Sequence, residues 1–244
     1  MSSKEWFAEW FDTSYYHTLY KDRNDEEAAL FIKNLIEVLQ LDPSSSVLDL
    51  ACGKGRHSVT LNKLGYNVLG VDLSSNSIQQ AKYNENDRLK FAVHDMREVI
   101  DGEKFDAVFN LFTSFGYFDA LCDNECVIRS IHTMLKENGY LVIDFMNAEK
   151  VIAKLVLNEV KTVDGIDFHI ERNYDGQHIF KHIRFEADGR SFDYTERVQA
   201  LKLTDFEKLL AENGFTIIRT FGDFSLNAFD PNISDRLIII AKKQ

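Results

Sequence analysis

Residues 47–57 read Val-Leu-Asp-Leu-Ala-Cys-Gly-Lys-Gly-Arg-His, an apolar run of strand type followed by a short loop with two glycines. Gly53 and Gly55 lack a Cβ, so the backbone can take positive φ there and pass close to a ligand. The residues behind the loop can open a helix, whose free backbone N–H groups suit a nucleotide-like ligand. The stretch therefore predicts a strand, a ligand-binding loop and a helix in succession.

A second acid stands at the distance that this interpretation requires. Asp72 ends the apolar run 67–72 and follows Asp49 by 23 residues (72 − 49). In a βαβ unit, an acid at the end of the second strand lies beside the ribose hydroxyls of a ligand bound at the first turn. The two acids and the glycine loop together predict a nucleotide-binding βαβ unit.

Length and charge limit the possible classes of protein. The chain has 244 residues, enough for one large α/β domain or one domain with an appended subdomain. Its formal net charge of −11 disfavours a nucleic-acid partner, which needs a basic surface. An acidic surface suits small-molecule or cationic substrates, or it only keeps the protein solvated.

The cysteines and the apolar runs bear on the compartment. The three cysteines are Cys52, Cys122 and Cys126, a sparse and odd set that favours a reducing environment over a disulfide framework. Histidines with matching ligand spacing are missing, so we expect no metal site. The sequence shows neither a signal peptide nor an apolar run long enough to span a bilayer. We therefore expect a cytoplasmic protein without membrane contact.

Strand and helix patterns alternate from residue 47 to residue 145. Strands are predicted at 47–50, 67–72, 89–93, 105–109 and 140–145, with helices at 56–64, from 74 or 75, and at 123–136. This alternation predicts a parallel sheet covered by helices on both faces. The ligand of such a sheet binds at the carboxyl ends of the strands. Polar groups stand at or just past four of these ends: Asp49, Asp72, Asp95 and Asn110.

The pattern changes after residue 147. Asp-Gly dipeptides at 164–165, 175–176 and 188–189 indicate hairpin turns of an antiparallel meander over about 156–201. A helix then ends at Gly214, and strands follow at 215–221 and 236–241. The loop between these two strands is too short for a parallel crossover, so the last strand should be antiparallel.

The predicted fold is therefore α/β: a Rossmann-like, seven-stranded, mostly parallel sheet with an antiparallel last strand, plus a small antiparallel β insertion. Its expected parts are a helical N-terminal cover (1–41), the nucleotide-binding core (42–150), the insertion (151–202) and the C-terminal part of the core (203–244).

The segment 4–23 carries seven aromatic residues and few aliphatic ones. It either packs permanently on the main domain or forms a mobile cover that orders over the ligand. Aromatic rings bury a large area, and tyrosine can still offer a hydroxyl to a ligand. Both interpretations remain open, and we expect a cover.

Two other nucleotide motifs fit less well. A dinucleotide fingerprint needs a third glycine where Ser58 stands, and no phosphate-binding Lys-Ser/Thr follows the loop. The acid at Asp49 suits a ligand whose amino-acid end carries an ammonium group. An NAD-dependent oxidoreductase thus remains a less favoured alternative.

Residues 47–57, Gly-Val-Asp-Leu-Ser at 70–74 and Asp-Met-Arg at 95–97 together resemble the class I S-adenosylmethionine-dependent methyltransferases. Residues 110–118 and 234–238 resemble a bacterial small-protein branch of that superfamily, and the similarity runs from about Tyr15 to the C-terminus. The resemblance implies the cofactor S-adenosyl-L-methionine and these binding residues: Tyr15, Tyr20, Arg23, Asp49, Ala51, Gly53, Gly55, Asp72, Leu73, Asp95, Met96, Asn110 and Leu111.

The resemblance also implies individual roles. Asp72 would accept the ribose hydroxyls, and Asp95 would bind the adenine amino group while Leu73 and Met96 pack on the ring. Gly53 and Gly55 would let the backbone pass the methionine part, and Asp49 would orient the loop or the ammonium group. The backbone at residues 110–111 would close the methionine end. Tyr15, Tyr20 and Arg23 would reach its carboxylate from the N-terminal cover.

The function implied is transfer of a methyl group to an unidentified small-molecule acceptor. The protein mainly aligns the acceptor with the activated methyl group, and a general base is needed only for a protonated acceptor. His57, Tyr117 and Asn147 are candidates for that base, and we assign no catalytic residue. The alternative is a cofactor-binding protein without its own transferase activity. The insertion would form part of the substrate site or a homodimer contact, or only cover an apolar sheet face.

Overall fold

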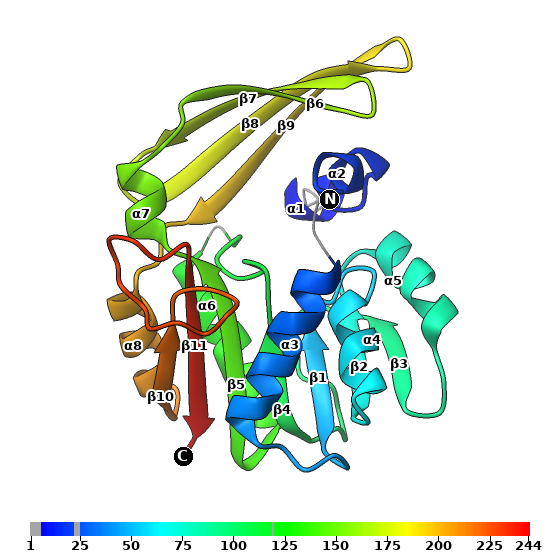
Figure 1. The fold of residues 1–244 in the computed structure, drawn as a ribbon, viewed down its shortest axis with the longest axis vertical. Helices are drawn as coiled ribbons and strands as arrows, with labels where there is room; N and C mark the ends of the chain where they lie inside the picture. Colours follow the sequence, from blue (N-terminus) through cyan, green and yellow to red (C-terminus); the bar gives the residue numbers. More distant parts are fainter. Residues whose placement is uncertain (1–5, 22–24, 119) are drawn as a thin grey trace.

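The computed structural model describes residues 6–21, 25–118 and 120–244. The chain forms two β-sheets, one with seven strands and one with four (Figure 1). Helices lie on both faces of the larger sheet, and the smaller sheet stands beyond the end of β5, where the chain leaves the larger sheet (Figure 1). Among the described residues, no helix is both long and apolar enough to cross a membrane.

The larger sheet has the strand order β10-β11-β5-β4-β1-β2-β3. Its strands are β1 (Ser46–Leu50), β2 (Asn67–Asp72), β3 (Leu89–Val93), β4 (Phe105–Asn110), β5 (Leu135–Met146), β10 (Phe215–Phe221) and β11 (Arg236–Lys243). The first five pair in parallel, whereas β11 runs antiparallel to both β5 and β10. The predicted sheet with an antiparallel last strand is therefore confirmed.

The two faces of this sheet are covered by different helices. Val47 packs with buried residues of α3 (Asp25–Leu39), α4 (Arg56–Lys63) and α5 (Ser75–Ala81). Its neighbour Leu48 points to the opposite face, where α6 (Leu121–Met134) and α8 (Leu203–Glu212) pack. Strands buried on both faces explain the continuous apolar runs of the sequence. Helix α3, which we had grouped with the N-terminal cover, packs on the core.

One predicted boundary is wrong. The expected helix runs to residue 136, but the helix of the structure ends at Met134 and β5 begins at Leu135. Leu135 is fully buried and pairs with Phe105 of β4. Packing in the core decides this end of the helix, and local turn chemistry does not.

The insertion is the predicted antiparallel meander. After α7 (Ala148–Ala153), the chain forms β6 (Asn158–Val163), β7 (Ile166–Tyr174), β8 (His178–Ala187) and β9 (Arg190–Gln199), which pair in sequence order. Its three hairpin turns fall at the predicted Asp-Gly dipeptides. The existence and the antiparallel form of the insertion are confirmed.

The N-terminal segment lies under the insertion sheet (Figure 1). It contains the short helices α1 (Trp6–Trp10) and α2 (Ser14–Leu19). Trp10 and Leu19 are each 1% exposed and form a hydrophobic cluster with side chains of the insertion: Val163, Phe168, Ile170, Ile183 and Phe185. We call the face of the insertion sheet that carries these side chains the inner face.

Candidate functional site

The candidate site lies at the carboxyl ends of β1 to β4. The chain runs from β1 outward to β2 and β3, and then returns to the other side of β1 as β4 and β5. The strand order therefore reverses between β1 and β4, which is where open α/β sheets bind ligands. Asp49, Asp72 and Asn110 lie in the last residues of their strands, and Asp95 follows the end of β3.

The glycine loop joins β1 to α4 through a run of positive φ angles. Ala51, Gly53 and Gly55 have φ of 64°, 55° and 81°. A Cβ on Gly55 would lie 2.6 Å from the ring of Phe91, so packing alone requires glycine there. At Gly53, apart from the glycine itself and its two chain neighbours, no atom of the described residues lies within 4 Å of the place a Cβ would take. Gly53 therefore leaves open space beside the loop, as a ligand site needs.

Asp72 holds this loop against the end of β2. Its Oδ2 accepts the Gly53 N–H and its Oδ1 accepts the Ser74 N–H, both at 2.8 Å. A carboxylate has about four lone-pair sites, so each oxygen keeps one for a ligand hydroxyl. Burial raises the pKa of Asp72, and the backbone hydrogen bonds partly oppose that rise.

Asp49 is buried and supports the start of α4, behind the glycine loop, from inside the protein. It is 1% exposed, and Ser58 Oγ donates to its Oδ2 at 2.5 Å. Burial raises the pKa of Asp49 to about 6, although the bonds to Ser58 lower it. Ser58 occupies the position of the missing third glycine. Gly70 of β2 provides the close contact instead, because a Cβ there would lie 2.8 Å from Ser58 Oγ.

Asp95 and its neighbours form the outer end of the site. Arg97 donates to both carboxylate oxygens of Asp95, at 2.6 Å for Nη2. Burial alone would raise the pKa of Asp95, but the bonds and charge of Arg97 outweigh it and keep the pKa below its usual value. Ser130 Oγ fixes the same turn by donating to the Met96 carbonyl at 2.6 Å. Leu73 is 38% exposed and available to pack on a ligand.

A strained turn follows β4. Asn110 is fully buried and donates through Nδ2 to the Leu50 carbonyl at 3.1 Å, which ties β4 to β1. Leu111 is also buried, and the next two residues, Phe112 and Thr113, both have positive φ. Positive φ is unusual for bulky and β-branched residues and commonly marks a functional segment.

The structure brings Asp144 and Arg236 to this turn, and sequence reasoning had assigned them no role. Asp144 of β5 is fully buried, and Arg236 of β11 donates to it at 2.8 Å. The available signal was a single acid inside the apolar run of β5, because a buried carboxylate requires a partner.

The N-terminal segment is fastened to both sheets. Asp12, between α1 and α2, accepts from Ser74 Oγ at 2.5 Å and from Asn76 Nδ2 at 2.8 Å, at the start of α5. On the other side, Trp10 Nε1 donates to Glu196 of β9 at 2.7 Å. The segment therefore bridges the start of α5 in the core and strand β9 of the insertion.

The predicted ligand-binding tyrosines lie at the insertion. The Tyr15 hydroxyl donates to Asp188 at 2.9 Å. The Tyr20 hydroxyl donates to Glu196 at 2.8 Å and accepts from Lys181 Nζ at 2.6 Å. The apolar inner face packs against α2, and this packing places Tyr15 and Tyr20 at the insertion. Arg23, the third residue of this group, lies outside the described residues.

The three candidate bases differ in their surroundings. Asn147 is 2% exposed and caps α7, and its Nδ2 donates to the carbonyls of Pro231 and Ser234, so its side chain has a structural role. His57 is 5% exposed, with its ring centroid 5.3 Å from that of Phe112. The Tyr117 ring packs edge-on against Trp6 of the N-terminal segment.

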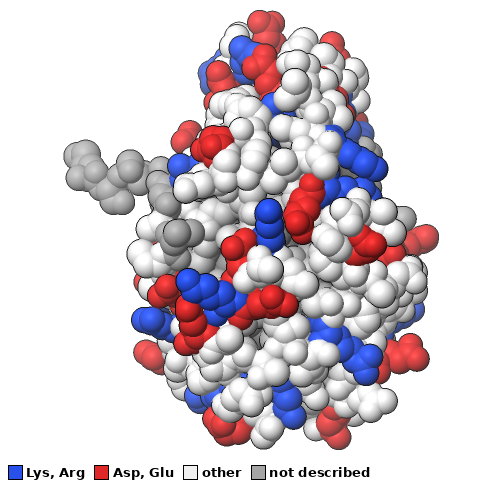
Figure 2. Space-filling view, turned by 90° about the vertical axis from the view of Figure 1, so that its left-hand side faces the viewer, with Lys and Arg blue, Asp and Glu red and all other residues white. Residues whose placement is uncertain are grey.

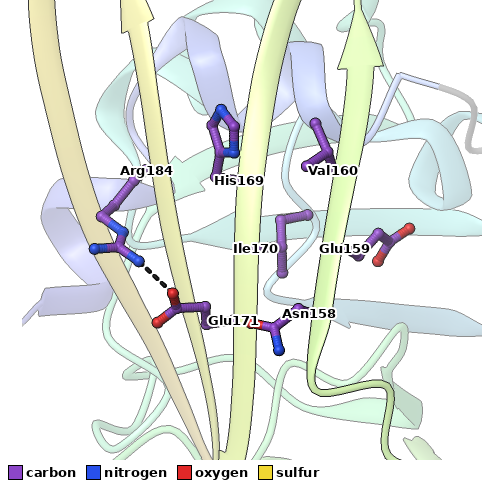
Figure 3. A pocket seen from close by; sticks show the side chains of 7 residues that line it. All are labelled: Asn158, Glu159, Val160, His169, Ile170, Glu171 and Arg184. Atoms are coloured by element: carbon purple, nitrogen blue, oxygen red, sulfur yellow. Dashed lines mark hydrogen bonds and ion pairs between the residues drawn. The ribbon is translucent and has the colours of Figure 1, made fainter.

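A groove on the opposite, outer face of the insertion is separate from the strand ends. Figure 3 shows its lining side chains, among them Val160, His169 and the ion pair between Arg184 and Glu171. These residues alternate with the buried side chains of the inner face. Within the described residues, no group of three or more histidine, cysteine or acidic side chains is arranged to hold a metal ion.

The fold and the strand-end site define a nucleotide-binding α/β protein of the doubly wound class. Residues 41–189 match the family model described as a methyltransferase domain. The chain is 31% identical over 229 residues to a glycine/sarcosine N-methyltransferase of Aphanothece halophytica, covering 91% of this chain and 83% of that protein. A glycine/sarcosine N-methyltransferase of Parasynechococcus marenigrum (strain WH8102) is 27% identical over 231 residues, covering 91% and 78%.

Among solved structures, a S-adenosylmethionine-dependent methyltransferase from Clostridium acetobutylicum ATCC 824 has the same fold. The TM-score is 0.79 at 21% identity, covering 94% of this chain and 96% of that chain. The chain belongs to the methyltransferase domain family, and it is a S-adenosylmethionine-dependent methyltransferase. The residues present fit that cofactor, because Asp72 keeps free acceptor sites beside the open space at Gly53.

Proposed function

We propose that S-adenosylmethionine binds at the carboxyl ends of β1 to β4, with its ribose hydroxyls on Asp72. One observation carries this proposal. The carboxylate of Asp72 is fixed by the backbone N–H groups of Gly53 and Ser74 and still has acceptor sites to offer. A carboxylate that is already held in position, beside a loop that leaves open space, suits the two neighbouring hydroxyls of a ribose.

The remaining predicted residues divide into direct and supporting roles. We propose that Leu73, Asp95 and Met96 contact the adenine, and that Ala51, Gly53, Gly55, Asn110 and Leu111 border the methionine part through their backbone. Asp49 supports the loop through Ser58 instead of touching the ligand, because it is 1% exposed. Tyr15 and Tyr20 fasten the N-terminal segment to the insertion, since their hydroxyls are already bonded there.

The cofactor supplies a methyl group already activated on a sulfonium. The chain then has to orient the acceptor and exclude water. Tyr117 and the aromatic rings of the N-terminal segment suit water exclusion, because Tyr117 packs against both Trp6 and Phe11. Asn147 is fully used as a cap, which leaves His57 and Tyr117 as the candidates for holding an acceptor proton.

We further propose that the acceptor is a nitrogen atom of a small molecule that binds between the inner face and the strand ends. The activity for which the glycine/sarcosine N-methyltransferase relatives are named supports nitrogen. Strand register aligns Arg172, Lys181 and Glu196 across the inner face, where each is 15–22% exposed. These groups suit a polar acceptor. Acidic and basic side chains lie interspersed on the face in Figure 2, which gives nucleic acid no broad basic surface there.

Two further proposals concern assembly and compartment. The exposed Val156, Leu157 and Val160, each about 60% exposed, suit a homodimer contact along β6. Light scattering that gives a mass of 28.2 kDa, the mass of one chain, would reject the dimer. The cysteines Cys52, Cys122 and Cys126 are free, which suits the reducing cytoplasm.

Calorimetry with S-adenosylhomocysteine tests the cofactor site, with NADH as the comparison. We expect S-adenosylhomocysteine to bind and NADH to give no heat. Binding of NADH alone would overturn the proposal. Release of S-adenosylhomocysteine with a panel of amine, hydroxyl and thiol acceptors then tests the acceptor. Turnover with amines alone supports nitrogen, and turnover with hydroxyls or thiols alone contradicts it.

A further inference from the structure

The backbone turn after β4 is held in an unusual conformation by a buried ion pair. Phe112 and Thr113 have φ of 60° and 56°, in the left-handed region that bulky and β-branched residues avoid. Two such residues in succession persist only where surrounding contacts impose the conformation. Those contacts come from two other strands, β5 and β11.

Asp144 of β5 bonds to the turn through two of its atoms and to Arg236 through a third. Its Oδ2 accepts the Phe112 N–H at 2.8 Å, and its backbone carbonyl accepts the Thr113 N–H at 2.9 Å. Its Oδ1 accepts from Arg236 Nε at 2.8 Å, and Arg236 Nη2 donates to Thr113 Oγ1 at 3.0 Å. The carboxylate and the guanidinium therefore bond to each other and each also bonds to the turn, which a planar group with several fixed donors can do.

The turn lies against the cofactor side of the sheet. It follows directly on the end of β4, which pairs with β1 at the point where the strand order reverses. The Phe112 ring lies 4.1 Å from the guanidinium carbon of Arg56 and 5.3 Å from the ring of His57, the first two residues of α4 behind the glycine loop. The turn therefore contacts the first residues of α4, directly behind the glycine loop.

A purely structural ion pair is a weak source of stability, because desolvation offsets the attraction between the charges. Here the ion pair also fixes the Phe112 N–H and the Thr113 hydroxyl of a strained turn, beside the bond from the Thr113 N–H to the Asp144 backbone carbonyl. Such an arrangement fixes the shape of the turn, and methyl transfer depends on accurate alignment of the reacting groups.

We infer that Asp144 and Arg236 are positioning residues that hold the turn 111–113 in the conformation that receives the methionine end of the cofactor. This inference rests on the proposed cofactor site. The adenosine end is held by β2 and β3, at the other side of β1, and does not depend on the turn. Loss of the ion pair should therefore weaken ligands that carry the amino-acid end and spare ligands that lack it.

The test compares two ligands by calorimetry: S-adenosylhomocysteine, and 5′-methylthioadenosine, which lacks the amino-acid end. Arg236→Lys keeps the charge but cannot bond Asp144 and Thr113 through two separate nitrogens. Thr113→Val removes the hydroxyl at nearly constant shape, and Thr113→Ser restores it as the matched control. Circular dichroism checks that each variant is folded. Thr113→Val carries the test if Arg236→Lys does not fold.

We expect Arg236→Lys to weaken S-adenosylhomocysteine at least tenfold and Thr113→Val at least threefold, with 5′-methylthioadenosine within twofold of the wild type. Thr113→Ser should bind both ligands as the wild type does. Equal weakening of both ligands, or of neither, would show a merely structural ion pair and overturn the inference. A wild-type protein that binds neither ligand would instead overturn the proposed cofactor site.

Discussion

Replacement of Asp72 by alanine removes the group on which the proposed cofactor site depends. In the folded protein, this carboxylate accepts two backbone hydrogen bonds at 2.8 Å and retains acceptor sites for a diol. Asp72→Ala thus removes the carboxylate that would accept the ribose hydroxyls, and it also releases the loop at Gly53. Asp72→Asn keeps one oxygen, so it should have a smaller effect.

The expected size follows from these bonds. A hydrogen bond to a charged group contributes roughly 1.5–3 kcal/mol. We take this range as the binding free energy that Asp72→Ala loses. Because about 1.4 kcal/mol corresponds to a tenfold change in the dissociation constant, the range predicts roughly 10- to 150-fold weaker binding.

Calorimetry with S-adenosylhomocysteine measures the effect directly. Asp101→Ala is the matched control, because Asp101 is an exposed acid near the opposite, amino end of β4. It should bind as the wild type does. Equal affinity of Asp72→Ala and wild type, within twofold, would refute the reasoning.

Three other predictions concern the cover and the core. Asp12→Ala should speed hydrogen exchange over residues 6–21, because it breaks the bonds to α5, whereas Glu9→Ala, an exposed acid on the same segment, should not; equal rates in both would contradict the fastening role. Burial raises the pKa of Asp49 to about 6, above its unfolded value of 3.8, so its contribution to stability falls as pH rises from about 4 to 6. Urea unfolding at pH 4 and pH 7 should show this loss, up to about 3 kcal/mol, in the wild type relative to Asp49→Asn, and an equal pH dependence in both would contradict it. Glu196→Ala should shift tryptophan emission to longer wavelength, because both tryptophans lie in the N-terminal segment and one donates to Glu196. Unchanged emission would count against the fastening of this segment to the insertion.

The core and the strand-end acids could be predicted because they depend on local pattern. Apolar runs that end in Asp49, Asp72 and Asn110 identify strands, and parallel strands bring their carboxyl ends to one edge of the sheet. The hairpin turns of the insertion could be predicted for the same reason, since Asp-Gly dipeptides favour them locally.

The contacts that sequence reasoning missed join distant parts of the chain. Arg236 and Asp144 are 92 residues apart and meet because β11 enters between β5 and β10. Trp10 and Glu196 are 186 residues apart and meet because the insertion folds over the N-terminal segment. Neither pairing leaves a periodic signal, so only the tertiary structure reveals the ion pair between Asp144 and Arg236 and the bond that ties the N-terminal segment to the insertion.

The most direct test of the account is a crystal structure of the full chain with S-adenosylhomocysteine. We expect the ligand at the carboxyl ends of β1 to β4, with its ribose hydroxyls within hydrogen-bond distance of the Asp72 carboxylate and its amino-acid end toward the turn at Phe112. A ligand bound in the groove on the outer face of the insertion, with the strand ends empty, would contradict it.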